Sequence, residues 1–144
     1  MPKRTATPAQ LTNPADIDGF MFAGNATFTL RSQRTGKHIT YRVQAKANVV
    51  GDVECYFVSV MTGSDNENSY TYLGRFDQRR TYWPDRRWRI AETDERRRAF
   101  DWFLRHKSHP ALEVWHEGRC GCCGRKLTTP ESIQRGIGPV CAAA

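Results

Sequence analysis

Cysteine spacing is the feature that most constrains what this sequence can fold into. Four of its five cysteines lie between residues 120 and 141, and Cys120 and Cys123 form a C-x-x-C pair followed by Gly124. Two intervening residues let both thiolates face one ion from a tight turn, and the glycine permits the left-handed backbone that closes the turn. The pair is therefore typical of a zinc knuckle, and the odd number of cysteines disfavours a disulfide framework.

A closed tetrahedral site needs two further ligands. Cys141 lies eighteen residues after the second cysteine of the pair. The segment between them predicts a short helix that is capped by Thr129 and ended by Gly136, which would bring Cys141 back to the pair. His116 precedes Cys120 by four residues and is the predicted fourth ligand. The sequence thus predicts one structural zinc ion per chain, held by His116, Cys120, Cys123 and Cys141.

The other two thiols have alternative interpretations. Cys55 lies in an apolar run, where it is either a small buried residue or the fourth ligand in place of His116. Cys122 adjoins Cys123, and because consecutive side chains point in different directions, we expect Cys122 to face away from the metal. The alternative to metal binding is a redox C-x-x-C pair, but such pairs usually begin a helix in a thioredoxin-like unit, and no parallel βαβ pattern is present.

Upstream of the cysteines, alternating apolar residues predict an antiparallel sheet. Apolar and polar residues alternate over 26–30 and 39–45, with Gly36 in the turn between, and again over 70–75. Residues 55–61 are apolar at nearly every position, which predicts a central strand covered on each side. Residues 94–105, preceded by Thr93 as N-cap, predict a helix that covers the sheet with Phe100 and Phe103.

The predicted fold class is α+β: a four-stranded antiparallel meander covered by one helix, with a small treble-clef-like zinc subdomain. We expect a flexible arm over residues 1–19, the sheet and helix over 20–110, and the zinc-knuckle segment over 111–144. No stretch approaches the roughly eighteen apolar residues of a membrane span, and the start of the sequence lacks the apolar segment of a signal peptide. The sequence therefore predicts an intracellular protein without a membrane partner.

The cysteine-rich segment carries a longer pattern. It reads H-x-x-x-C-x-x-C-G-R-x-L-T-x-P-E-S-I from His116 to Ile133 and closes with G-I-G-P-x-C from Gly136 to Cys141. This pattern resembles a group of small phage and prophage proteins that share a domain of unknown function. The resemblance implies a phage origin, hence the cytoplasm of a host cell, and a zinc-bound C-terminus, but it implies no activity. Cys122 departs from the pattern, because the family often has a polar or basic residue there.

Basic residues are concentrated in the middle of the chain. Its 22 basic and 15 acidic side chains give a formal charge of +7, and residues 75–107 hold 11 of the basic and 6 of the acidic ones. Guanidinium groups suit phosphate and exposed aromatic rings stack on unpaired bases, so the arginines interleaved with Tyr82, Trp83 and Trp88 predict a surface for DNA or RNA. The predicted surface comprises Arg79, Arg80, Arg86, Arg87, Arg89, Arg125 and Lys126. The alternative is a solvated connection whose tryptophans pack on the sheet.

Together these features predict a small zinc-binding phage accessory protein that binds nucleic acid. The alternative is a protein that inhibits a host nucleic-acid enzyme or an antiviral defence component by docking on an acidic patch. An enzyme is the least favoured class, because the sequence shows no P-loop, no activated nucleophile and no paired carboxylates with a histidine. If three cysteines and a water held the zinc, Glu113 or Glu117 would have to act as acid or base.

Overall fold

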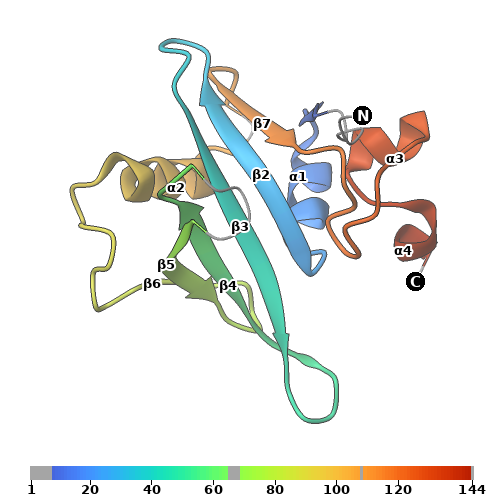
Figure 1. The fold of residues 1–144 in the computed structure, drawn as a ribbon, viewed down its shortest axis with the longest axis horizontal. Coiled ribbons are helices and arrows are strands. Elements are labelled where there is room, and N and C mark those ends of the chain that lie inside the picture. Colours follow the sequence, from blue (N-terminus) through green and yellow to red (C-terminus); the bar gives the residue numbers. More distant parts are fainter. Residues whose placement is uncertain (1–7, 65–68, 108, 144) are drawn as a thin grey trace.

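The computed structural model describes residues 8–64, 69–107 and 109–143. Figure 1 shows a twisted sheet with α2 toward one end and the C-terminal helices α3 and α4 at the other. The elements are, in chain order, β1 (Ala9–Leu11), α1 (Pro14–Met21), β2 (Asn25–Ser32), β3 (His38–Ala47), β4 (Val53–Met61), β5 (Tyr70–Phe76), β6 (Tyr82–Pro84), α2 (Glu95–Arg105), β7 (Leu112–His116), α3 (Pro130–Arg135) and α4 (Pro139–Ala143).

The sheet of the described residues has seven strands in the order β1-β7-β2-β3-β4-β5-β6, and its neighbouring strands pair antiparallel. The predicted four-stranded meander is therefore wrong in extent. Its four strands are β2 to β5, and three short strands extend them on both sides. Local alternation could not show β7, because this strand comes from the C-terminal segment and pairs between β1 and β2, which are distant in sequence.

The β2-β3 hairpin forms as its alternation predicts. Phe28 lies opposite Tyr41 on the buried face, and Thr29 lies opposite Thr40 on the other face, where their hydroxyl oxygens are 2.8 Å apart. Gly36 closes the turn with a φ of +72°, a conformation that glycine adopts without a steric penalty. The hairpin thereby separates one apolar face from one polar face.

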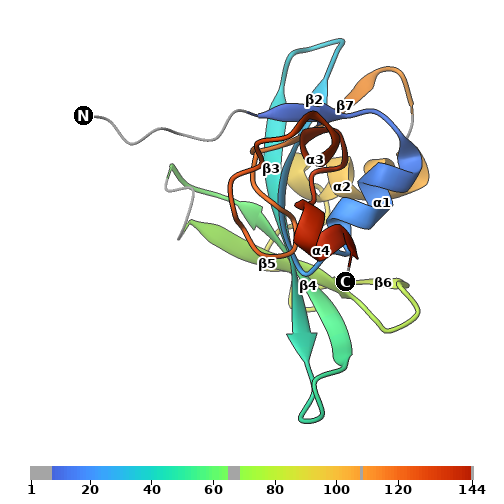
Figure 2. The ribbon, with the colours of Figure 1, turned by 90° about the vertical axis from the view of Figure 1, so that its right-hand side faces the viewer.

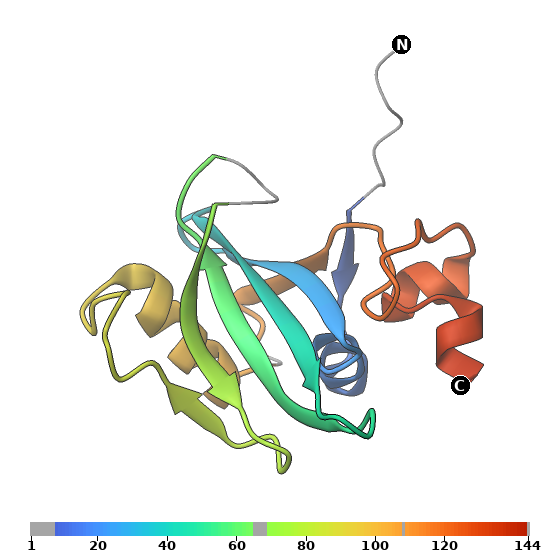
Figure 3. The ribbon, with the colours of Figure 1, turned by 60° about the horizontal axis from the view of Figure 1, so that its bottom comes forward.

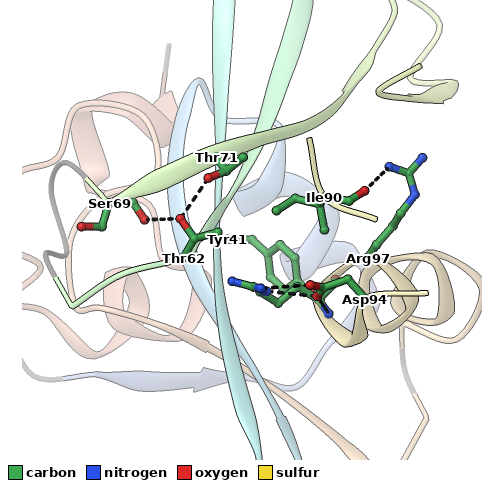
Figure 4. A network of polar contacts seen from close by, with 8 residues as sticks. Tyr41, Thr62, Ser69, Thr71, Ile90, Asp94 and Arg97 are labelled. Carbon is green, nitrogen blue, oxygen red and sulfur yellow. Dashed lines mark hydrogen bonds and ion pairs between the residues drawn. The ribbon is translucent and has the colours of Figure 1, made fainter. Parts of the chain in front are cut away.

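Helix α2 covers the apolar face of the sheet. Phe100 and Phe103 are fully buried, and the ring centroid of Phe100 lies 5.0 Å from that of Tyr41. The helix begins one residue later than predicted, because Asp94 rather than Thr93 is the N-cap and accepts a hydrogen bond from the backbone of Arg96. Figure 4 shows Tyr41 reaching this first turn, where its hydroxyl donates to the carbonyl oxygen of Arg96.

The predicted flexible arm contains regular structure. Residues 9–11 form β1 and residues 14–21 form α1, in which Asn13 caps the backbone of Ala15 at 2.8 Å and Pro14 occupies the first turn. Phe20 and other apolar residues of α1 join the buried core, so burial orders this part of the chain. Residues 1–7 of the predicted arm lie outside the described residues. None of the described helices has the length and apolar character needed to cross a membrane.

The second face of the sheet, here called the open face, carries Thr27, Arg42, Phe57, Tyr72 and Trp83. Figures 2 and 3 show α1 and α2 together on the opposite side of the sheet. The prediction that β4 is covered on both sides is thus wrong for the described residues, and Phe57 is 36% exposed on the open face. Apolar residues on both sides of β4 therefore do not indicate that the strand is buried between two layers.

Candidate metal centre

Three of the predicted ligands converge. The Sγ atoms of Cys120, Cys123 and Cys141 all lie within 4.8 Å of one another. Cys120 and Cys123 come from the turn after β7, and Cys141 comes from α4. Cys120 is buried, Cys141 is half-buried and Cys123 is exposed, so the group lies at the surface with its deepest thiol toward the protein. Three sulfur atoms this close could hold one metal ion.

Backbone hydrogen bonds shape the turn that presents the C-x-x-C pair. The amide of Gly124 donates to the carbonyl of Cys120 at 2.9 Å, and the amide of Cys120 donates to the carbonyl of Arg125 at 2.8 Å. Gly124 has a φ of +78°, which the sequence predicted from the need for a left-handed residue after the second cysteine. The turn is thus closed by the main chain as well as by any bound ion.

Two amides point at the sulfur of Cys120. The N–H of Gly138 lies 3.2 Å from this sulfur and the N–H of Cys122 lies 3.4 Å from it. Burial raises the pKa of the Cys120 thiol, but hydrogen bonds from Gly138, Cys123 and Cys122 outweigh burial and lower the pKa to about 7. The thiolate is the form that binds metal ions, so the main chain prepares Cys120 as a ligand.

Helix α3 brings Cys141 back to the pair as predicted. Thr129 is its N-cap and accepts a hydrogen bond from the backbone of Ser132 at 3.3 Å, Pro130 is in the first turn, and Gly136 ends the helix with a φ of +72°. Hydrogen bonds with the thiols of Cys122 and Cys123 raise the pKa of Cys141 to about 12. Cys122 is exposed in the turn and is not among the three cysteines whose sulfur atoms converge.

The structure does not bring His116 into the cluster. His116 is fully buried in β7, and its Nδ1 accepts a hydrogen bond from the amide of Gly118 at 2.9 Å. Its Nε2 therefore carries the proton and donates to the carbonyl of Ile133 at 2.6 Å. Burial lowers the pKa of His116, which keeps the ring neutral. Both nitrogens serve the main chain, and the ring joins β7 to α3.

Cys55, the alternative fourth ligand, also lies outside the cluster. It is buried in β4, where it pairs with Lys46 of β3. Among the described residues, the group able to hold a metal contains Cys120, Cys123 and Cys141. Cys55 thus occupies the position of a small buried residue in a strand.

The seven basic residues of the predicted nucleic-acid surface are distributed over several parts of the molecule. The guanidinium of Arg80 lies 4.6 Å from the ring centroid of Phe22, whose ring packs on the buried face. The guanidinium of Arg89 lies 5.4 Å from the ring centroid of Tyr72 on the open face. Arg79, Arg86 and Arg87 are exposed in the connections around β6, and Arg125 and Lys126 line a cavity of about 350 Å³ that Cys120, Cys123 and Cys141 also line.

Phe20 of α1 anchors the cysteine-rich segment to the sheet, and the sequence analysis did not identify it. A Cβ on Gly121 or on Gly136 would lie 2.7 Å or 2.6 Å from the Cδ2 atom of Phe20, so both glycines pack directly on its ring. The Asn-Pro pair at residues 13 and 14, an N-cap followed by proline, is the pattern that could have located α1.

Comparison with known proteins finds a match for the C-terminal segment. The model of a family of unknown function (DUF6011) matches residues 111–144, the segment that holds the cysteine cluster. This match agrees with the resemblance of the segment to a domain of unknown function. No curated protein and no solved structure matches the chain.

Proposed function

We propose that this protein binds one zinc ion through Cys120, Cys123 and Cys141 and that it binds nucleic acid. The observation that carries the zinc proposal is the convergence of three thiols within 4.8 Å. Thiolates are soft ligands that suit zinc rather than magnesium or calcium. Zinc binding stabilises a segment that could not fold on apolar burial alone.

Two forms of the zinc site differ in the fourth ligand. Cys122 would complete a four-thiolate site, and a water or a partner atom would complete a three-thiolate site. Cobalt replaces zinc in such sites, and its sulfur charge-transfer absorption grows with the number of thiolates. If Cys122 is a ligand, Cys122→Ser will weaken this absorption; if it is not, the absorption will stay unchanged while Cys123→Ser reduces it.

Elemental analysis tests the zinc proposal directly. Purified protein should contain one zinc per chain, and Cys120→Ser and Cys123→Ser should lose it. Cys55→Ser is the matched control, because it removes a thiol that lies outside the cluster. A wild-type protein that is folded, stable and free of metal would overturn the proposal.

The nucleic-acid proposal is supported by the basic side chains around β6 and beside the cysteines. Arg79, Arg86 and Arg87 are exposed, and Arg125 and Lys126 are exposed at the rim of the cysteine cluster. Guanidinium and ammonium groups bind phosphate and release counterions when they do so. The formal charge of +7 adds a general attraction to polyanions.

Salt dependence tests this second proposal. Affinity for mixed oligonucleotides should fall steeply as salt rises, and an Arg86→Ala, Arg87→Ala double variant should bind more weakly with a shallower slope. Failure of the wild-type protein to bind any oligonucleotide at low salt would overturn the proposal. Stoichiometric capture of an acidic host protein without oligonucleotide binding would favour the inhibitor alternative instead.

A further inference from the structure

The open face of the sheet combines aromatic and basic side chains in a repeated order. Strand register places Gln44, Phe57, Arg75 and Trp83 directly across β3, β4, β5 and β6. A second, neighbouring row runs through Thr27, Arg42, Ser59 and Tyr72 across β2 to β5. Because side chains of one strand alternate between faces, these residues lie on the face opposite the one that carries the buried Phe28, Tyr41 and Val58.

Aromatic rings remain accessible on this face. Phe57 is 36% exposed and Trp83 is 44% exposed, and Tyr70 and Tyr72 are half-buried. The rings of Phe57 and Tyr72 meet edge to face with centroids 6.0 Å apart. The indole N–H of Trp83 donates to the carboxylate of Asp77 at 2.9 Å, which fixes this ring at the edge of the sheet. Large rings held in place but left uncovered suit stacking with a partner.

Each of these rings has a cation beside it. The guanidinium of Arg42 lies 3.9 Å from the ring centroid of Tyr70, and that of Arg75 lies 5.9 Å from the ring centroid of Trp83. Arg89 approaches Tyr72 at 5.4 Å, and Lys46 approaches Phe57 at 5.8 Å. The cations and the rings thus form one layer of cation–π contacts on the open face.

Basic side chains outnumber acidic ones on the strands of this face. The strands β2 to β6 contribute four basic residues, Arg31, Arg42, Lys46 and Arg75, and one acidic residue, Glu54, which forms a 3.7 Å ion pair with Lys46. Two further carboxylates flank the face: Asp77 accepts the indole N–H of Trp83, and Glu117 lines a cavity together with Thr27 and Arg42. An acidic protein partner would match the basic side chains but would leave the rings without a stacking partner. Duplex DNA would present phosphates but keep its bases paired in its interior.

We propose that the open face over β3 to β6 is the binding surface for single-stranded nucleic acid, in which bases stack on Phe57, Tyr72 and Trp83 and phosphates lie against Arg42 and Arg75. The proposal rests on the nucleic-acid part of the proposed function. It places the binding site on a surface of the sheet instead of on the chain segment from Arg79 to Arg89. Stacking tolerates any base, so binding is expected to show little sequence preference.

Binding at the open face and binding at the segment Arg79 to Arg89 predict different effects of arginine substitutions. Arg89 belongs to the open face through Tyr72, whereas Arg80 lies over Phe22 on the opposite side of the sheet. Substitution of Arg89 should therefore weaken binding, and substitution of Arg80 should not. If both arginines contributed equally, binding would follow the chain segment rather than the sheet.

Two tryptophans provide a matched pair of variants. Trp83 and Trp88 are 44% and 48% exposed, and each has an arginine over its ring. Trp83 stands on the open face, but Trp88 packs against Arg97 of α2. Trp83→Ala should bind a single-stranded oligonucleotide about five- to a hundredfold more weakly, and Trp88→Ala should bind like the wild type. Phe57→Ala and Tyr72→Ala should behave like Trp83→Ala.

Fluorescence anisotropy with labelled oligothymidine, labelled oligouridine and a duplex of equal length measures these effects. Arg75→Ala should weaken binding and lower the salt slope by about one counterion, and Arg98→Ala, an exposed arginine of α2, is its charge-matched control. Thermal unfolding and zinc content of each variant report that the fold is intact. Oligothymidine and oligouridine distinguish DNA from RNA as the preferred strand, and preference for either supports the surface.

The outcomes separate this inference from the proposed function. If the wild type binds no oligonucleotide, both are overturned. If the wild type binds and the open-face variants bind equally well while Arg86→Ala, Arg87→Ala does not, the proposed function stands and the open face is overturned. Tighter binding of the duplex than of either single strand also overturns the open face, because paired bases cannot stack on its rings.

Discussion

His116 donates a hydrogen bond through Nε2 to the main-chain oxygen of Ile133, over 2.6 Å. The amide of Gly118 donates to the other ring nitrogen, so one buried side chain satisfies a strand-end amide and a helical carbonyl together. Buried main-chain groups without partners are costly. The histidine that the sequence marks as a fourth metal ligand therefore has a structural explanation that needs no metal.

Substitution of this residue separates the two roles. His116→Gln should lower the free energy of unfolding by about 1–3 kcal/mol, because at least one buried partner loses its hydrogen bond. The variant should still hold one zinc per chain, measured by elemental analysis, whereas Cys123→Ser should not. A folded His116→Gln protein that has lost its zinc would identify His116 as a ligand after all.

Gly136 and Gly36 form a natural pair for testing how the C-terminal segment is anchored. Both have a φ of +72°, but a Cβ on Gly36 would meet nothing within 4 Å, and a Cβ on Gly136 would lie 2.6 Å from the ring of Phe20. Gly36→Ala should cost about 1–2 kcal/mol from backbone strain alone, and Gly136→Ala should cost about 1–3 kcal/mol more from overpacking. Urea unfolding measures both, and equal losses would show that Phe20 does not pack on Gly136.

Asp85 makes stability depend on pH. Its carboxylate accepts hydrogen bonds from the amides of Arg87 and Arg89 at 3.1 and 3.2 Å and from the guanidinium of Arg89 at 3.1 Å. Burial raises its pKa, but these bonds outweigh burial and hold the pKa below its usual range. A lowered folded-state pKa contributes stability above the unfolded value of about 4, and this contribution is lost as the pH falls through the folded value.

Asp85→Asn isolates that contribution. The variant should be less stable than the wild type by about 1–2 kcal/mol near neutral pH, with most of the loss from the amide bonds because Arg89 is itself 42% exposed. Chemical unfolding at a series of pH values should show this difference shrinking below about pH 4. A difference that stays constant down to the acid limit would exclude Asp85 as the responsible group.

The fold could be predicted from the sequence where the pattern was local. The β2-β3 hairpin and α2 follow from alternation, from a turn glycine and from an acidic helix start, all of which lie within a few residues. Strand β7 could not be predicted in this way, because its five residues gain their role from pairing with β1 and β2, which lie 80 or more residues away in sequence. Strand β6 has three residues and ends in Pro84, so its pattern is too short to recognise.

The candidate metal site could likewise be predicted only where its sequence pattern is local. The C-x-x-C turn, the glycine that closes it and the helix capped by Thr129 are local, and the structure has them all. Spacing cannot tell whether a histidine faces the metal or the main chain, since His116 and Cys120 are close in sequence in either case. The aromatic rows of the open face also depend on register between strands, which is why the sequence showed the arginines of one segment rather than the surface that crosses four strands.

Removal of zinc should loosen the C-terminal segment and leave the sheet intact. Among the described residues after His116, the buried hydrophobic side chains are Cys120 and Leu127, which is too little apolar material to hold the segment by itself. With a chelator, hydrogen exchange should accelerate at least roughly tenfold at the amides of Cys120, Gly124 and Leu127, whose bonds close the turn.

The amides of Val43 and Val58 are the internal control, because they belong to neighbouring strands at the centre of the sheet and are fully buried. Their protection should stay unchanged in the same sample, and added zinc should restore the slow exchange of the turn. Exchange that is equally slow at Cys120 and Leu127 with and without metal would mean that the packing of Phe20 and the hydrogen bonds of His116 suffice to order the segment.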